Sequence, residues 1–309
     1  MTYTLLKFWK TSPHFRGAFW KISSFLCFSA INGIVRYLSQ TAEAIGQTPL
    51  PAYEIAFFQN LFGLVFLIPW IVQHGPKSLK TRSPVLQLCR ITLSAIGVVL
   101  WYISLTHMPL AQAVALMFLG PLITVMGAKV FLKEELTKER SLAILIGFVG
   151  GGIISQSTFA VGTFSLIALL PILAATCFSG ATLMIRRLAK DDSPQLIVTY
   201  LLVFMAPALF IPTLLYGAWP DAWHWPWLLM MGGFAASAHL CLSQAYASAE
   251  VSYLAPYGFT KWFASSLIGV VAFAELPSFW TTFGASIVMG AIVFLGYGEI
   301  RRKKLLSYS

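Results

Sequence analysis

Two phenols and a basic side chain follow one another at four-residue steps in the last third of the chain. Tyr253, Tyr257 and Lys261 lie in an apolar stretch at residues 251–273 and would share one face of a helix. A charge near the middle of a bilayer costs roughly 3 kcal/mol, so it usually faces a cavity or a partner. Pro256, between the two tyrosines, lacks an amide hydrogen and frees a backbone carbonyl. We therefore predict a substrate site led by Lys261; the alternative is a structural lysine bonded to a carbonyl.

A polar and aromatic helix face is also predicted within residues 86–106. Its members recur every three or four residues, the spacing of one helix face: Arg90, Ser94, Gly97, Trp101 and Ser104. Inside a membrane, such a face lines a cavity or a close contact between helices. Trp101 and Arg90 are therefore candidates for the cavity lining. Arg90 stands near the end of its stretch, so its long side chain can alternatively extend to the interface.

Asn32 and His239 complete the candidates for the cavity. Asn32 shares a predicted helix face with Ser29 and Arg36 in the first apolar stretch. His239 lies in the apolar stretch at residues 225–246, where a lone histidine is more often a hydrogen-bonded packing residue than a proton relay. A structural role therefore stays open as the alternative for His239.

Arg36 and Glu54 lie near the outer ends of the first and second apolar stretches. We expect them to pair across the connection at residues 40–52, either as an external gate or as a plain interfacial ion pair. A positive charge is also stabilising in the last turn of a helix, where Arg36 is expected. Glu54 is the acid best placed to accept a proton if transport is coupled to protons.

Enzyme motifs are missing from the sequence. It contains no H-E-x-x-H, no G-x-S-x-G, no Walker loop and no cluster with metal-ligand spacing. We therefore expect no enzyme activity, no cofactor and no metal. Without a Walker loop, any transport must be driven by an ion gradient or by the substrate's own gradient.

The composition predicts that membrane helices position all of these residues. Of 309 residues, 58% are hydrophobic and 10% are charged, whereas soluble domains carry about 25% charged residues. A membrane-spanning helix needs about 20 apolar residues. Stretches of suitable length lie at 17–39, 53–73, 86–106, 109–132, 140–157, 162–185, 195–216, 225–246, 251–273 and 279–298. The sequence thus predicts an all-α membrane protein with ten transmembrane helices.

Basic residues predict the orientation of these helices. The first, third, fifth, seventh and ninth connections hold no lysine or arginine: 40–52, 106–108, 156–161, 216–224 and 274–278. Because basic residues stay on the cytoplasmic side during insertion, we expect both termini in the cytoplasm and a location in a bacterial inner membrane. The net charge of +10 comes from these short clusters and not from one exposed face, so we expect no nucleic-acid partner.

An internal repeat divides the ten predicted helices into two groups of five. CFSAINGIVRYL, starting at Cys27, matches CFSGATLMIRRL, starting at Cys177, and Glu135 and Gly150 match Glu275 and Gly290. The predicted organisation is a cytoplasmic tail at 1–16, a first five-helix repeat at 17–157, a second at 162–298 and a basic cytoplasmic tail at 299–309. Because five is odd, the second repeat crosses the membrane with the opposite orientation. Inverted repeats of this kind are typical of secondary transporters.

Two long runs of sequence resemble a known family. ISLTHMPLAQAVALMFLGPLITVMGAKVFLKEEL, followed by IGFVGGGII, resembles the end of an EamA-type repeat of the drug/metabolite transporter superfamily. SQAYASAEVSYLAPYGFTKWFASSLIGVVAFAELP, followed by FGASIVMGAIVF, resembles the second copy. The resemblance covers residues 17–298 and implies a ten-helix permease with a substrate cavity between its halves.

Shorter motifs resemble one branch of this superfamily, the bacterial S-adenosylmethionine uptake permeases: EIAFFQN, LCR and APY. The sequence departs from that branch at Gln59 and in the run GFTKW after Tyr257, so the subfamily and the substrate stay open.

These patterns together predict a secondary transporter of a small polar metabolite, such as an amino acid or an S-adenosylmethionine-like compound, that works by alternating access. Its expected partners are the small-molecule substrate and the lipid bilayer. A proton, a counter-substrate and a second copy of the chain in a homodimer are left open, as is the direction of transport. The alternative is a structural or enzymatic membrane protein without transport activity.

Overall fold

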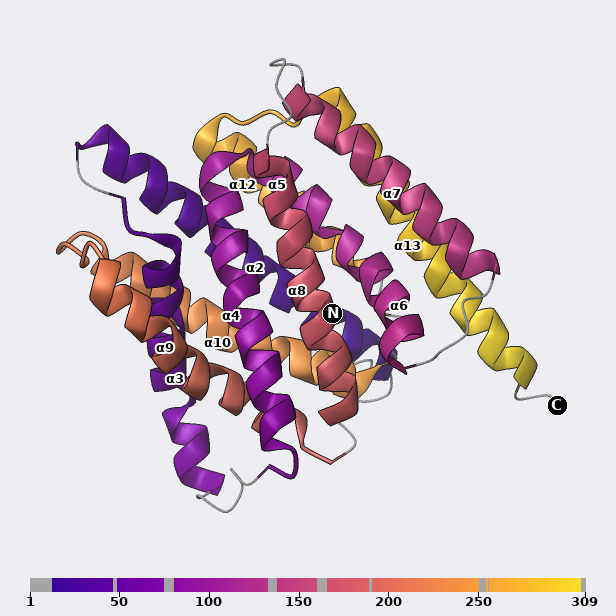
Figure 1. Cartoon of the computed structure of the whole chain (residues 1–309), viewed down its shortest axis with the longest axis horizontal. Helices are drawn as coiled ribbons and strands as arrows, with labels where there is room; N and C mark the ends of the chain where they lie inside the picture. The colour runs from indigo at the N-terminus through magenta and orange to yellow at the C-terminus, as the bar shows by residue number, and fades with distance from the viewer. Residues whose placement is uncertain are drawn as a thin grey trace, which may run out of the picture.

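The computed structural model describes residues 13–46, 49–74, 81–132, 138–159, 166–188, 191–249, 254 and 256–306. Within these ranges all regular structure is helical (Figure 1). A bilayer offers the backbone no water to bond, so a spanning segment satisfies its own N–H and C=O groups as a helix. The prediction of an all-α membrane protein is confirmed.

The described residues form ten helical segments, which we assign as membrane spans in two five-helix repeats of opposite orientation. The first five are α2 (Pro13–Ala44), α3 (Ala52–His74), α4 (Pro84–His107), α5 (Leu110–Met117) with α6 (Leu119–Leu132), and α7 (Lys138–Phe159). The second five are η2 (Leu166–Ala168) with α8 (Leu169–Leu188), α9 (Pro194–Tyr216), α10 (Trp225–Ser248), η3 (Pro256–Gly258) with α12 (Phe259–Phe273), and α13 (Phe279–Leu306).

Most of these segments are recognisable as spans from their length and hydropathy alone. Six are long and apolar enough to cross a membrane, namely α2, α3, α4, the α5–α6 segment, α9 and α13, and α7, α8 and α12 hold shorter apolar helices. α10 falls in neither group although it is 24 residues long. Its sequence includes Ser237, His239, Ser243 and Gln244, which lower its hydropathy.

The fourth span of each repeat is broken at the same aligned position. In the first repeat the break between α5 and α6 falls at Phe118, and in the second repeat η3 ends at Gly258. These two residues are 140 positions apart, the same offset that relates the glutamates of the repeat. Pro121 lacks the hydrogen that would bond the carbonyl of Met117, and Pro256 opens η3. The repeat therefore places matching helix breaks in both halves.

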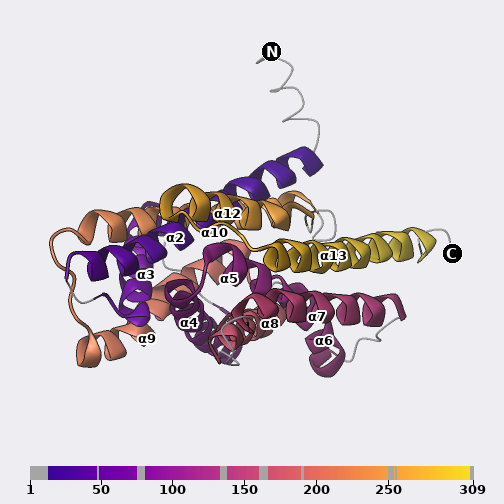
Figure 2. The same cartoon turned by 90° about the horizontal axis from the view of Figure 1, so that it is seen from above.

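Four helices form the two flanks of the bundle. α7 runs beside α13 on one flank, and α3 runs beside α9 on the other (Figures 1 and 2). The α7–α13 contact is close because Gly150 meets Gly284: a Cβ on Gly150 would stand 2.8 Å from Val288 Cγ2 and 3.0 Å from the Gly284 carbonyl oxygen. The interior between the flanks is built by α2, α4, α5, α8, α10 and α12.

Polar and apolar side chains are distributed as a membrane environment requires. Large apolar side chains cover the outside, where lipid would contact them, among them Val72, Val85, Val271 and Leu276. Amide and charged side chains lie inside, among them Asn32, Gln59, Asn60, Gln87 and Arg90. Buried polar groups need hydrogen-bond partners inside the bundle, so their contacts identify the candidate site.

Candidate substrate site

Lys261 lies in the first turn of α12, directly after the break formed by η3. Its ammonium nitrogen stands 5.6 Å from the ring centre of Phe28 on α2 and 5.2 Å from that of Trp101 on α4. A cation at such a distance is attracted by the negative face of a ring. No carboxylate of the described residues lies within ion-pair distance of this ammonium. Lys261 is therefore held by aromatic faces and keeps donors for a further partner.

A chain of hydrogen bonds connects the residues around this lysine. The indole N–H of Trp101 donates to Asn32 Oδ1 over 3.1 Å, and Asn32 Nδ2 donates to Ser265 Oγ over 3.4 Å. The Ser265 hydroxyl donates to Ser29 Oγ over 3.1 Å, and Ser29 donates to the Lys261 carbonyl over 3.1 Å. The bonds link α2, α4 and α12 and fix the side chains relative to one another. The following residues form what we name the central cluster: Phe28, Ser29, Asn32, Trp101, Lys261 and Ser265.

His239 and Arg90 extend the central cluster toward the other end of the bundle. The His239 ring stands edge-on to Phe28 with ring centres 5.3 Å apart. Arg90 is only 2% exposed and donates from Nη2 to the Ile197 carbonyl over 2.9 Å, while its buried Nε has no partner in the described structure. Arg90 and His239 are close enough to interact electrostatically. Arg90 therefore points into the bundle against α9 and does not extend to the interface.

The structure describes only one of the two candidate tyrosines. Tyr257 lies half-buried in η3, and Tyr253 lies outside the described residues. The change from η3 to α12 interrupts regular α-helix between Tyr257 and Lys261. The shared face of all three residues therefore remains a prediction, whereas the loosened backbone at Pro256 is observed.

Arg36 pairs with Glu275 and not with Glu54, as the sequence had led us to expect. Both Nε and Nη2 of Arg36 donate to Oε1 of Glu275, and the two side chains are 12% and 13% exposed. The expectation was wrong because it considered neighbouring spans only. The partner comes from the connection after α12, which no local pattern associates with α2.

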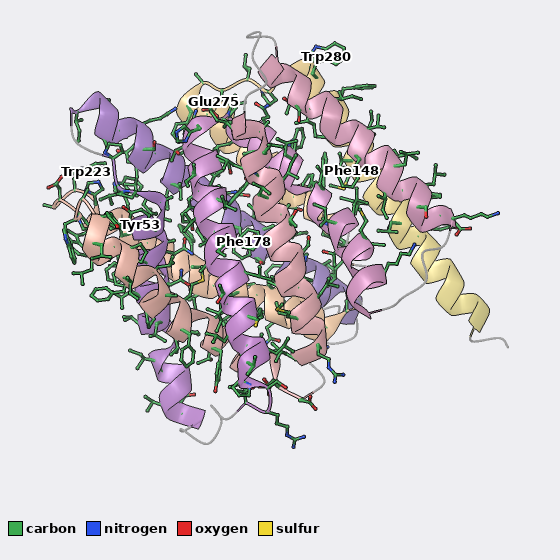
Figure 3. All side chains as sticks on the ribbon, viewed as in Figure 1. Tyr53, Phe148, Phe178, Trp223, Glu275 and Trp280 are labelled. Atoms are coloured by element: carbon green, nitrogen blue, oxygen red, sulfur yellow. The ribbon has the colours of Figure 1, made fainter. Side chains whose placement is uncertain are left out.

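Further bonds tie this ion pair to two helix ends. Nη1 of Arg36 donates to the carbonyls of Leu105 at 3.1 Å and Thr106 at 2.9 Å, in the last turn of α4. Oε2 of Glu275 accepts from the amide of Leu110 at 3.0 Å, in the first turn of α5. Figure 3 shows Glu275 at the end of the molecule where α4 ends and α5 begins. We name these five residues the latch cluster.

Glu54 has a different role in the structure. Its side chain is fully buried; Oε2 accepts from the amide of Ala218 over 2.9 Å, and Oε1 has no partner among the described residues. The neighbouring Tyr53 hydroxyl donates to the Tyr216 carbonyl over 2.7 Å. Glu54 therefore fastens the start of α3 to the segment after α9, away from the central cluster.

A buried carboxylate also joins the two repeats near the start of α4. Asp192 accepts hydrogen bonds from the hydroxyl of Thr81, from Gln87 Nε2 at 3.0 Å and from the amide of Arg82 at 3.3 Å. Burial acts to raise the pKa of Asp192, but these bonds and the nearby Arg82 charge together hold it below its usual value. The carboxylate stays ionised and bonded at neutral pH.

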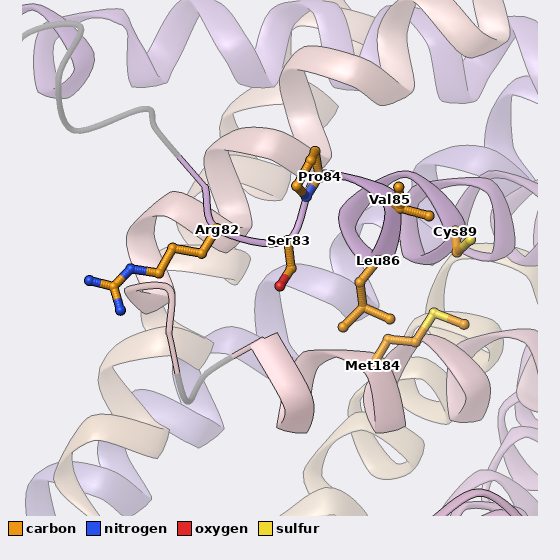
Figure 4. A pocket seen from close by; sticks show the side chains of 7 residues that line it. All are labelled: Arg82, Ser83, Pro84, Val85, Leu86, Cys89 and Met184. Carbon is orange, nitrogen blue, oxygen red and sulfur yellow. The ribbon is translucent and has the colours of Figure 1, made fainter.

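Two open pockets are present on the outer surface, apart from the central cluster. One, of about 450 Å³, is lined by Arg82, Ser83, Pro84, Val85, Leu86, Cys89 and Met184 (Figure 4). The other, of about 610 Å³, lies between α3 and α10 and is lined mainly by apolar side chains. No residue of the central cluster lines either pocket. We interpret both as lipid-facing surface hollows.

Several members of the central and latch clusters were not among the predicted site residues, among them Ser265, Phe28 and Glu275. Ser265 follows Lys261 by four positions, so the spacing argument could have found it. Phe28 is repeated as Phe178, but an aromatic residue in an apolar run carries no signal by itself. Glu275 was noted only as a repeated residue. Its role depends on a contact between distant segments.

The fold and the central cluster define a multi-pass membrane protein with a polar and aromatic site among α2, α4 and α12, beside the break at η3. A model of the EamA-like transporter family matches residues 16–156 and 165–297. A riboflavin transporter of Brucella anthropi is 34% identical over 81% of this chain and 89% of its own length. An S-adenosylmethionine uptake transporter of Rickettsia felis is 26% identical over 94% of this chain and 95% of its own.

A solved crystal structure of a protein also has this fold, with a TM-score of 0.60 and 18% sequence identity, over 88% of this chain and 96% of its own. The chain belongs to the EamA-like transporter family, with one match in each repeat. It is a membrane transporter for small molecules, in agreement with the prediction at this level.

Proposed function

We propose that the protein is a secondary transporter that carries a planar, polar metabolite by alternating access, with riboflavin as the first candidate. The observation that carries this proposal is Lys261, whose ammonium lies between two aromatic rings beside a helix break. The substrate would bind there between the halves at 17–157 and 162–298. Both halves would move about this site, and no chemical change of the substrate is involved.

The broken helices support a central binding site. Secondary transporters with inverted repeats bind substrates where spanning helices are interrupted, because the interruption exposes backbone groups at membrane depth. Here the matched breaks fall at Phe118 and at η3, and Trp262 just beyond Lys261 donates to the Ala111 carbonyl over 3.1 Å. The two broken segments therefore contact each other beside the central cluster.

The chemistry of the central cluster favours a neutral or anionic ring compound over a cation. Flat rings stack on aromatic side chains, and an ammonium group donates hydrogen bonds to carbonyl or anionic oxygens. Lys21 is close enough to Lys261 for their charges to repel, so a positive substrate would add to this repulsion. Riboflavin has a planar ring system with two carbonyl oxygens, whereas S-adenosylmethionine carries a positive sulfonium. The chemistry of the site therefore favours riboflavin, the substrate named for some relatives, over S-adenosylmethionine, the substrate named for others.

The orientation and the energy source also belong to this proposal. The absence of lysine and arginine from alternate connections supports cytoplasmic termini in a bacterial inner membrane. Glu54 is buried and keeps one oxygen without a described partner, which supports it as a proton-coupling residue. A proton or counter-substrate is thus compatible with the proposed cycle, and a homodimer is not required by it.

The test is uptake of labelled riboflavin by proteoliposomes that contain the purified protein. We expect saturable uptake that excess flavin inhibits and S-adenosylmethionine does not. Lys261→Met should reduce uptake about tenfold or more, because it removes a charged hydrogen-bond donor. Lys129→Met is the matched control, since Lys129 is an exposed cation in the last turn of α6, and it should transport like the wild type.

Two outcomes would contradict the proposal. One is wild-type uptake by Lys261→Met in a protein that folds normally. The other is inhibition by S-adenosylmethionine that equals inhibition by riboflavin, because the site would then show no preference against positive charge.

A further inference from the structure

On α2, α4 and α12, a member of the latch cluster or a residue bonded to it lies one helical turn from the central cluster. Arg36 follows Asn32 by four residues on α2, and Leu105 follows Trp101 by four residues on α4. On α12, Gly269 follows Ser265 by four residues, and its carbonyl accepts from the Glu275 amide over 2.9 Å. A turn of helix rises about 5.4 Å. The latch cluster therefore covers the central cluster on one side.

The ion pair is matched to the helix ends that it contacts. The C-terminal end of a helix carries partial negative charge and the N-terminal end partial positive charge. Arg36 lies on the last carbonyls of α4, and Glu275 lies on the first free amide of α5. Each charge thus satisfies a backbone group that the connection from α4 to α5 leaves without a helical partner.

The ion pair also joins the two repeats. Arg36, α4 and α5 belong to the first half, and Glu275 follows α12 of the second half. The ion pair therefore has to break before the two halves can move apart at this end of the molecule. Replacement of one partner leaves the other partly buried without its counter-charge, which is strongly destabilising for the closed contact.

We propose that the Arg36–Glu275 pair is the latch that closes the substrate site toward the side predicted to be external. This inference rests on the proposed function, since it assumes that the site opens alternately to the two sides. The latch forms when the external side is closed and breaks when the external side opens. Glu275→Gln shifts the equilibrium toward the externally open state.

The test measures access to the site and needs no substrate. The native cysteines are replaced by alanine (Cys27, Cys89, Cys177 and Cys241) and Ser265→Cys is introduced as a probe within the central cluster. A membrane-impermeant thiol reagent is added to right-side-out vesicles, and the labelling rate is measured. We expect Glu275→Gln to raise this rate about tenfold or more. Arg36→Lys, which keeps the charge but loses the planar fork, should raise it less.

Asp192→Asn is the matched control, because it converts another buried carboxylate that joins the halves, near the opposite end of α4. Asp192→Asn should leave the rate of external labelling equal to that of the Ser265→Cys protein in which Arg36 and Glu275 are unchanged. Equal labelling with and without Glu275→Gln, including no labelling in either, would overturn the latch. Arg36→Lys supplies the same comparison if Glu275→Gln does not fold.

The labelling result and the transport result can fail separately. If riboflavin is not transported but Glu275→Gln raises labelling, the substrate proposal fails and the latch stands. If riboflavin is transported and labelling does not change, the latch fails and the substrate proposal stands.

Discussion

The indole of Trp101 makes two separate contributions at the central cluster. Its N–H donates to Asn32, which holds α4 against α2, and its face lies against the Lys261 ammonium. A buried acceptor that loses its donor destabilises a fold by about 1–3 kcal/mol. Loss of a ring face from a binding site weakens attraction to a cation or a stacked ring by about 0.5–2 kcal/mol. The two contributions can be separated by substitution.

Trp101→Phe keeps a ring face and removes the N–H, whereas Trp101→Ala removes both. We expect Trp101→Phe to lower the thermal stability and to keep riboflavin affinity near that of the wild type. Trp101→Ala should in addition weaken riboflavin binding about fivefold to tenfold. Flavin fluorescence quenching by the purified protein gives the affinity, and a thermal melt gives the stability. Wild-type affinity in a folded Trp101→Ala variant would contradict a site at this residue.

For single residues, the sequence indicated which side chains are candidates for the site, but it gave less information about the residues that they contact. A charge inside a span is costly in lipid, so the position of Lys261 within an apolar stretch was enough to single it out as a candidate. Its neighbour Ser265 shares the same face of α12, so the four-residue spacing could have identified it. Phe28 lies on another helix, and an aromatic residue in an apolar span gives no signal by itself. The partner of Arg36 could not be found, because Glu275 lies in a distant connection.

Among the elements, the close contact of α7 with α13 shows how the sequence indicated a packing feature without its details. The run Gly150-Gly151-Gly152 is typical of tightly packed helices. In the structure Gly150 lies against Gly284 and Val288, whereas a Cβ on Gly152 would meet nothing within 4 Å. Adjacent residues face different directions on a helix, so the run could not reveal which glycine faces the partner helix.

This difference provides a matched pair of substitutions. We expect Gly150→Ala to lower the melting temperature by several degrees, because the added methyl group overlaps Val288 and the Gly284 backbone. Gly152→Ala should leave it unchanged or raise it, since alanine is a better helix former by about 1 kcal/mol. Thermal melts in one detergent measure both. Equal melting temperatures for both variants would contradict the packing described for α7 and α13.

The ten spans and their repeat were predictable because a membrane restricts the possible structures so strongly. Long apolar runs that cross a membrane can only form helices, and the basic connections predict the orientation of these helices. The helix breaks were harder to predict from the sequence. Pro256 pointed to one of them, but only the structure shows that Phe118 occupies the aligned position in the first repeat.

For the whole molecule, the matched breaks, the central cluster and the latch cluster describe one site that lies between two halves. The latch cluster covers it on one side, and Asp192 joins the halves near the opposite end of α4. Under the proposed function, the carrier exposes this site to one side at a time, so inward and outward movement of substrate are coupled through the same protein molecule.

Counterflow in proteoliposomes tests this central claim most directly. Vesicles are loaded with unlabelled riboflavin and diluted into medium with a trace of labelled riboflavin. We predict that labelled riboflavin accumulates transiently above its equilibrium level in vesicles that contain the protein, and that Lys261→Met abolishes this peak. Entry of label at the slow rate of protein-free vesicles, with no transient peak, would contradict transport of riboflavin by alternating access.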